Sequence, residues 1–452
     1  MMTGHMTSGV RFNKSGVWCC LLITLAVLLS CQARTPPSGS RLGVEIGTTQ
    51  PTIAPLASTA TAIQIGHTST PSATPLLCTL TPLPPLPTNI SIIPPQPLSA
   101  TPAATPAILE VIAQLVEREV FYTDGVDFPS EIWKLDLSTL EKMQLFYSDE
   151  PGFEVGELAL SPDKEFIVFT YAVYDPINQA HTHHSGLQMI HIDGLELQTL
   201  TEIDEDDVLI GGPIWSPDGN LIAYSRTACP PGGYPCIDHI HILDLDTGRD
   251  QTLIEGGVVF AWSPEGDKIL YGLSNDNGFY DGLCMFDLDS GGRETLWEEE
   301  GLVFGQPAWQ PHGEQVAVTV MEKETIWSTD PEARLYLVDV TTKQRRELGK
   351  VDAHDIQWSR DGEKLVYFTP IAYRRPTWPT RLWLLDLRGG SFAQLLDTTA
   401  FAGKPAWSTN GQALLLVVGE PKAPRWISVM AITDQSLTKL VSTRTPFVSV
   451  TW

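Results

Sequence analysis

Basic side chains are scarce in this chain of 452 residues, in which 29 Lys and Arg stand against 54 Asp and Glu. Four of the basic residues and one of the acidic residues lie before residue 108, so the remainder carries a net charge of −28. A surface of that sign repels the phosphates of nucleic acids and of anionic lipids. We therefore exclude nucleic acid as a partner, and the same charge would keep an exported protein soluble.

Long apolar runs are scarce as well. The run from Val17 to Leu29 follows the basic residues Arg11 and Lys14 and is closed by Ser30. It is clearly shorter than the roughly 20 residues of a membrane-spanning helix. A basic flank, a short apolar run and a small residue are typical of a secretory signal peptide, which we assign to residues 1–30. An uncleaved anchor is the alternative, and either one would export the rest of the chain.

The residues Leu28-Leu29-Ser30-Cys31 resemble the lipobox of bacterial lipoproteins. The resemblance implies that Cys31 is lipidated and becomes the first residue of the mature chain. It also implies that the protein is held at the outer face of the cytoplasmic membrane or at the outer membrane, and that it contacts the membrane through the lipid anchor only.

Charges nearly vanish between residues 31 and 107, where Arg34, Arg41 and Glu45 are the only ones. Fifteen of the 35 prolines of the chain lie in this segment, among many Thr, Ser and Ala. A segment of this composition cannot bury enough apolar surface to fold. We predict that residues 31–107 are a disordered tether and that residues 108–452 are the folded domain.

Cysteine is used sparingly, with seven in the chain. Cys229 and Cys236 flank the six residues PPGGYP. In an exported chain this spacing favours a disulfide that closes a short loop. A zinc site is the alternative, and it would need further ligands that the spacing does not supply.

One hairpin sequence is repeated along the chain, and its clearest copy is PIWSPDGNLIAYS at residues 213–225. Its tryptophan recurs every 45 to 49 residues, at Trp215, Trp262, Trp309, Trp358, Trp407 and Trp452, and Leu160 takes its place in one earlier copy. The turns that follow read SPDK, SPDG, SPEG, QPHG, SRDG and STNG. Pro, Asp and Gly suit a tight turn, and the next strand is apolar on both faces, which indicates that it is covered on both sides.

A second repeated residue is an aspartate that lies between apolar residues just before another turn. It occurs at Asp136, Asp244, Asp287, Asp339 and Asp386. We expect these carboxylates to accept hydrogen bonds from turn amides. Each period then holds four short strands, named a to d, with the Trp at the end of strand a. Units of this size pack into a ring. We predict an all-β fold, a seven-bladed β-propeller of four-stranded antiparallel blades, in which the C-terminal strand joins the N-terminal blade, with a short helix over residues 106–117.

Over residues 119–452 the chain resembles the WD40-like PD40 repeats of the TolB family, whose W-S-P-D-G turn and following I-A-[FY] strand are best matched by residues 215–224. The resemblance implies a propeller but little about function, because the same fold serves binding proteins, peptidase gates and some lyases. TolB itself has an N-terminal α/β domain and six blades, whereas this chain has the tether and seven predicted blades.

In such a propeller the b-to-c and d-to-a connections share one face, and here they are longer and more varied than the turns on the other face. Recognition is expected on such loops, through the residue types that dominate interface energetics. The candidate binding residues are Tyr174, Tyr234, Tyr280, Trp327, Tyr373, Arg374, Arg375 and Trp378. The two arginines could hold an acidic partner or pair with acids of their own chain.

Three histidines in a b-to-c loop, His181, His183 and His184, are candidate metal ligands, because His-x-His places two imidazoles on one side of an extended segment. Some propeller lyases bind a metal through histidine, so the resemblance permits a metal-dependent polysaccharide lyase or hydrolase. A polar solvated loop is the alternative. The chain has no G-x-S-x-G motif, so we do not expect the α/β-hydrolase domain of prolyl-oligopeptidase relatives.

These patterns together favour a binding or scaffold module of the cell envelope. We expect a membrane-tethered monomer that binds an envelope protein or peptide, performs no catalysis and uses no cofactor. The metal-dependent polysaccharide enzyme built on the His181–His184 loop is the alternative.

Overall fold

The computed structural model describes residues 112–452, with gaps at residues 114, 127, 176–181, 206–207, 230–235, 275–279, 327, 329–331, 371–379, 399–400, 403, 420–424 and 446–447. The predicted signal peptide, the lipidation site Cys31 and the predicted tether lie outside the described residues. No helix in the described ranges is long and apolar enough to cross a membrane.

Five sheets are built from four or five antiparallel strands each. One contains β1 (Glu119–Asp124), β2 (Glu131–Asp136), β3 (Lys142–Tyr147) and β30 (Val450–Thr451). The next contains β4 (Phe153–Leu160), β5 (Phe166–Tyr174), β6 (Thr182–His191) and β7 (Gln198–Ile203). A third contains β8 (Val208–Trp215), β9 (Leu221–Ala228), β10 (Ile237–Asp244) and β11 (Arg249–Glu255).

The other two follow the same plan. The fourth sheet contains β21 (His354–Trp358), β22 (Lys364–Pro370), β23 (Thr380–Asp386) and β24 (Ser391–Thr398). The fifth contains β25 (Phe401–Ala402), β26 (Ala406–Trp407), β27 (Ala413–Gly419), β28 (Trp426–Ala431) and β29 (Leu437–Ser442). In the fourth sheet the strands pair in chain order, and in the fifth β25 and β26 both pair with β27, which is followed by β28 and β29.

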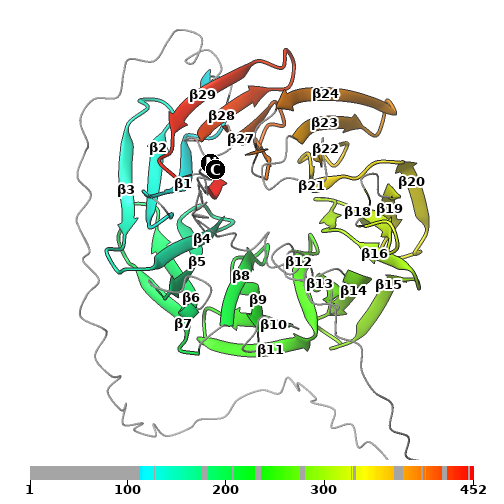
Figure 1. Ribbon diagram of the computed structural model, residues 1–452, viewed down its shortest axis with the longest axis horizontal. Coiled ribbons are helices and arrows are strands. Elements are labelled where there is room, and N and C mark those ends of the chain that lie inside the picture. Colours follow the sequence, from blue (N-terminus) through cyan, green and yellow to red (C-terminus); the bar gives the residue numbers. More distant parts are fainter. Residues whose placement is uncertain are drawn as a thin grey trace, which may run out of the picture. The chain divides into compact units, whose positions relative to one another are not determined.

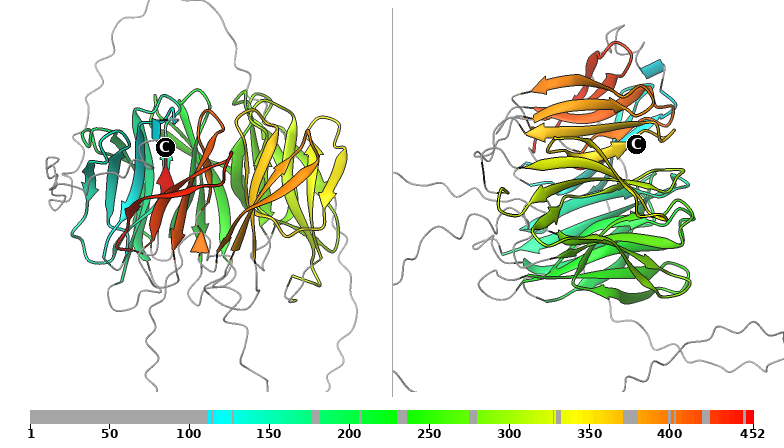
Figure 2. Two further views of the ribbon diagram at one scale, coloured as in Figure 1. Left: turned by 90° about the horizontal axis from the view of Figure 1, so that it is seen from above. Right: turned by 90° about the vertical axis from the view of Figure 1, so that its right-hand side faces the viewer.

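The remaining sheet has nine strands. It contains β12 (Gly257–Trp262), β13 (Lys268–Ser274), β14 (Tyr280–Asp287), β15 (Arg293–Glu298), β16 (Leu302–Phe304), β17 (Ala308–Trp309), β18 (Gln315–Glu322), β19 (Ala333–Asp339) and β20 (Arg345–Gly349). Strands β14 and β16 are joined by one residue pair, Tyr280 with Phe304. Figure 1 shows the sheets arranged around a common centre, with the edges of the ring seen in Figure 2. The structure is therefore a β-propeller of four-stranded antiparallel blades, as the sequence predicts.

The last strand of the chain completes the first blade. Strand β30 is antiparallel to β1 and pairs Phe121 with Thr451 and Tyr122 with Val450. The Thr123 N–H also donates to the carbonyl oxygen of Ser449 at 3.1 Å. The predicted joining of the two ends is thus present, through a strand of only two residues.

An ion-paired arginine reinforces this joint. Arg444, shortly before β30, places Nε 3.2 Å from Oδ2 of Asp124 and also pairs with Oε2 of Glu131. Its backbone N–H donates to Oδ1 of Asp124 at 2.7 Å. Since both carboxylates belong to the β1–β2 hairpin, one side chain ties the C-terminal segment to the N-terminal blade.

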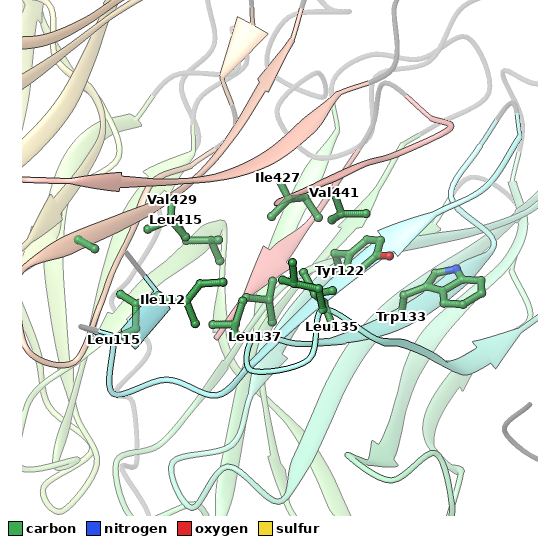
Figure 3. Packing of buried hydrophobic residues seen from close by; sticks show 13 residues of the cluster. Ile112, Leu115, Tyr122, Trp133, Leu135, Leu137, Leu415, Ile427, Val429 and Val441 are labelled. Carbon is green, nitrogen blue, oxygen red and sulfur yellow. The ribbon is translucent and has the colours of Figure 1, made fainter. Parts of the chain in front are cut away.

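Apolar side chains fill the spaces between neighbouring blades. One cluster packs Tyr122 and Leu135 of the first blade against Leu415 and Ile427 of the last (Figure 3). The central strands are buried on both faces, as in Phe166–Tyr174, where only the first and last residues are half-buried. Burial on both faces is what the continuous apolar strands of the repeat predict.

The repeated turns are held by the predicted chemistry. In the SPDG turn Ser216 Oγ donates to Oδ1 of Asp218 at 2.6 Å and accepts the N–H of Leu221 at 2.9 Å. The turns at Ser161, Ser359 and Ser408 repeat both hydrogen bonds. Gly219 has a φ of +78°, the left-handed conformation that glycine adopts without strain.

The repeated aspartates also act as predicted. Asp244 Oδ1 accepts the N–H of Thr247 at 2.9 Å, and Asp339 Oδ1 accepts the N–H of Thr342 at 2.7 Å. These hydrogen bonds hold the pKa of both carboxyls below the usual value. Asp136, Asp287 and Asp386 accept turn amides in the same way.

The predicted helix over residues 106–117 is wrong at its C-terminal end. Helical backbone is present at residues 112–113, and residues 115–118 are not helical. Among the described residues the N–H of Leu115 donates to the carbonyl of Ile112 at 3.0 Å. Both side chains are buried in the cluster of Figure 3.

Candidate functional site

Most residues predicted for the recognition face lie outside the described residues. These are Tyr234, Trp327, Tyr373, Arg374, Arg375 and Trp378. The described candidates are Tyr174, the half-buried last residue of β5, and Tyr280, the first residue of β14.

Tyr280 is part of the core and not a free aromatic side chain. Its ring lies 4.8 Å from that of Phe260 in an edge-to-face arrangement, and it packs on the cluster around Phe304. Burial, and then the charge of Asp238, raises the pKa of its hydroxyl. Tyr280 is thus half-buried, and its role in binding a partner stays a prediction. Its strand β14 pairs with β16 at this residue.

The histidine loop is described only in part. His181 lies outside the described residues, whereas His183 and His184 are in β6. His183 Nε2 is 3.7 Å from Oδ2 of Asp175. The ring centres of His184 and Tyr171 are 6.1 Å apart in an edge-to-face arrangement. Where the structure is described, no group of three or more His, Cys, Asp or Glu side chains is placed to hold a metal ion.

The b-to-c connections nevertheless show features of an exposed surface. A disulfide joins Cys229 to Cys236. Three large apolar side chains in or beside these connections are exposed: Val126 at 73%, Ile237 at 54% and Trp426 at 36%. Because successive strands are antiparallel, these connections all lie at the same ends of their blades. Leu195 at 53% and Phe392 at 49% are exposed beside the c-to-d turns, so exposed apolar side chains occur at both ends of the blades.

At the other ends of the innermost strands, the repeated tryptophans join the blades. Trp215 Nε1 donates to the carbonyl of Ala159 at 3.0 Å, and Trp262 Nε1 donates to that of Ile214 at 3.2 Å. The same bond from one blade to the preceding one joins Trp358 to Ala308, Trp407 to Gln357 and Trp452 to Trp407. We name this series the indole belt.

Trp309 interrupts the indole belt. Its Nε1 donates to the carbonyl of Gly313 at 3.0 Å, within its own turn, instead of reaching the preceding blade. This is the QPHG turn, in which Gln310 replaces the usual Ser and donates to the carbonyl of Gly362 at 2.8 Å. Gly313 is also the one glycine of the five turns that lacks a positive φ.

A cavity of about 220 Å³ lies at this interruption. The lining comes from β12, from residues 306–311 around β17, from β21, and from Lys404 just before β26. It comprises Phe260, Ala261, Gln306, Pro307, Ala308, Trp309, Pro311, Ile356, Gln357, Trp358 and Lys404. These strands are the innermost of their blades, so the cavity is near the centre of the ring (Figure 1).

Sequence reasoning missed this cavity, although two signals point to it. QPHG is the one turn of the six that lacks the first Ser, and Lys404 is one of 29 basic residues in an acidic chain. Gln306 and Lys404 each lie three residues before a repeat Trp, the same position relative to the turn. That equivalence becomes meaningful only when the blades bring the two strands together.

No family model matches this chain. A curated relative, the uncharacterized peptidase YuxL of Bacillus subtilis (strain 168), is 24% identical over 213 residues, which is 46% of this chain and 29% of the relative. The chain therefore matches less than a third of the length of that relative.

Solved structures share the fold. A puromycin-hydrolyzing peptidase of Mycobacterium tuberculosis is 13% identical with a TM-score of 0.50, over 78% of this chain and 57% of that one. TolB from Acinetobacter baumannii is 17% identical with a TM-score of 0.43, over 74% and 82%. An oligogalacturonate lyase in complex with manganese is 12% identical with a TM-score of 0.49, over 67% and 91%. At these identities the likeness is one of fold.

Proposed function

We propose that this protein is an exported, membrane-tethered propeller that binds an envelope protein or peptide on the face of its b-to-c connections and performs no catalysis. The observation that carries the proposal is the contrast between the two ends of the blades. One end is built from the same hydrogen-bonded turn in blade after blade, whereas the other carries varied connections and a disulfide.

The chemistry of this face fits a protein partner. Trp426 and Ile237 are large apolar groups of the kind that anchor interfaces, and an aromatic anchor is favoured over a small aliphatic one. Lys439 Nζ lies over the Trp426 ring, 5.0 Å from its centre, so a cation stands beside the exposed aromatic side chain. Arg374, Arg375 and Trp378 would extend the same surface.

The proposal includes a finer account of the ring. Strands β12–β15 and β16–β20 of the nine-stranded sheet each follow the order of a single blade and share one residue pair. Counting them as two blades gives seven in all. The lipid anchor on Cys31, the tether over residues 31–107 and a monomeric state complete the proposal.

An enzymatic function is the alternative. Structures with the same fold include peptidases and a lyase, and the histidine loop would be the metal site of a polysaccharide lyase or hydrolase. Metal analysis of the purified protein before and after treatment with a chelator tests this alternative. A stoichiometric metal whose removal abolishes cleavage of an acidic polysaccharide would favour the enzyme.

Site-specific photo-crosslinking on whole cells tests the binding proposal. A photoreactive amino acid at Val126 or Trp426 should capture one discrete envelope protein. The matched control is Glu265, an exposed residue of the SPEG turn at the opposite ends of the blades. Equal capture from Glu265 and Val126, or capture of lipid alone, would refute a recognition face at the b-to-c connections.

A further inference from the structure

The cavity at the interrupted indole belt is a built feature of the fold and not a packing accident. Five indoles reach the preceding blade, and only Trp309 turns back to its own hairpin. Gln310 takes the place of the serine that holds the other turns and spans to Gly362 instead. The cavity lies at this place, with Ala261 of β12 and Trp309 of β17 in its lining.

The size of the cavity restricts its occupant. Its volume of about 220 Å³ is below the ~300–1,000 Å³ of pockets that enclose a drug-sized molecule. It therefore accepts a group of the size of one amino-acid residue. A chain end fits this limit, whereas the middle of a folded partner does not.

The lining selects the charge of the occupant. Lys404 is the one charged side chain among the described lining residues, and no carboxylate is present among them. Lys404 is exposed and makes no ion pair within 4.0 Å to a described residue, so its ammonium is available to a ligand. An ammonium in a lining without acids attracts an anion, even on a protein whose net charge is −25.

The rest of the lining suits a peptide end. Gln306 provides a carboxamide, a hydrogen-bonding group that matches a peptide unit, whereas Gln357 Nε2 already donates to the carbonyl of Ile356 at 2.6 Å. Phe260, Trp309 and Pro311 provide apolar surface for a side chain. A metal ion would require anionic or imidazole ligands, which this lining does not have.

From these observations we infer a second binding site, separate from the b-to-c face, that takes the C-terminal residue of a peptide. The free carboxylate pairs with Lys404, the last side chain lies against Phe260 and Trp309, and the carboxamide of Gln306 meets the last peptide group. A C-terminal residue presents a carboxylate and an apolar side chain on one residue-sized body, which matches Lys404 and the apolar part of the lining together.

The test uses two probes that differ only in charge, acetyl-Gly-Gly-Leu with a free carboxylate and the same peptide as its C-terminal amide. Binding to the whole exported protein is measured by calorimetry and by tryptophan fluorescence, because Trp309 and Trp358 line the cavity. The acid should bind and the amide should bind at least about tenfold more weakly, as expected for loss of a charge-assisted hydrogen bond.

Variants locate the site. Lys404→Met should weaken binding of the acid to the level of the amide. Lys164→Met is the matched control, because it removes the same charge from an exposed position in the SPDK turn, away from the cavity lining, and should leave binding unchanged. Both lysines are exposed, so both variants should fold.

Three outcomes overturn the inference: equal binding of acid and amide, equal loss in both variants, or no binding of either peptide. Binding of trigalacturonate in place of the peptide would also overturn it, and would favour a polysaccharide ligand. None of these outcomes bears on the crosslinking test, since the cavity and the b-to-c face are probed by different residues.

Discussion

Arg444 allows the strength of the joint between the two ends of the chain to be measured. We predict that Arg444→Met lowers the free energy of unfolding by about 2 kcal/mol. Removing one partner of a fully buried ion pair costs about 3–5 kcal/mol, whereas exposed pairs are worth about 0–1 kcal/mol. The Asp124 and Glu131 side chains are each 10% exposed, but Arg444 is 50% exposed, which places this pair between the two limits.

The assay is equilibrium urea unfolding followed by circular dichroism and extrapolated to zero denaturant. The matched control is Arg381→Met, which removes an arginine whose pair with Asp397 is at the surface, with side chains 39% and 59% exposed at 3.7 Å. We expect a loss of less than about 0.5 kcal/mol for the control. Losses that agree within about 0.5 kcal/mol between the two variants would refute the view that Arg444 reinforces the joint.

Two further predictions concern the indole belt and a buried carboxyl. Trp262→Phe should lower the free energy of unfolding by about 2–3 kcal/mol, because it leaves the Ile214 carbonyl without its donor and removes ring volume. Trp309→Phe should lower it by about 1 kcal/mol less, because its indole bonds only within its own turn. Urea unfolding that ranks the two variants in the reverse order contradicts the indole belt. The Glu154 side chain is 5% exposed, and burial raises the pKa of its carboxyl to about 7 from 4.5. The folded state therefore loses stability as the pH rises from about 4.5 to 7 and regains it on acidification. Relative to Glu154→Gln, the native protein should therefore lose up to about 3 kcal/mol between pH 5 and pH 8, and a pH-independent difference between the two would show that the carboxyl is not buried in solution.

The repeat could be read from the sequence because its chemistry is local. The Ser, Asp and Gly of SPDG hydrogen-bond within six residues of one another, and Asp244 bonds to Thr247 only three residues away. The disulfide closes a loop of six residues for the same reason. Such features depend on neighbours in the chain, so composition and spacing predict them.

The candidate site was less accessible to sequence reasoning. Tyr280 is at the start of a strand in a varied loop region, which suggests exposure, yet the pairing of β14 with β16 places it against Phe260. The cavity combines Ala261, Trp309 and Lys404, which are between about 50 and 140 residues apart in the chain. The QPHG turn is visible as a departure, but its effect on the indole belt depends on the preceding blade.

The amino-acid order alone determined the four-stranded unit, its turns and its period, because hydrogen bonds and side-chain alternation within a few dozen residues suffice for these. The strand that closes the first blade could also be predicted, because the first repeat unit lacks an a strand, although β30 and β1 are about 330 residues apart in the chain. Only the tertiary structure decided which carbonyl each indole reaches, that Arg444 meets two carboxylates more than 300 residues earlier, and that Lys404 has no acid beside it among the described residues of its cavity. Those contacts depend on how successive blades pack face to face, and packing across blades is set by the whole ring and not by any one repeat.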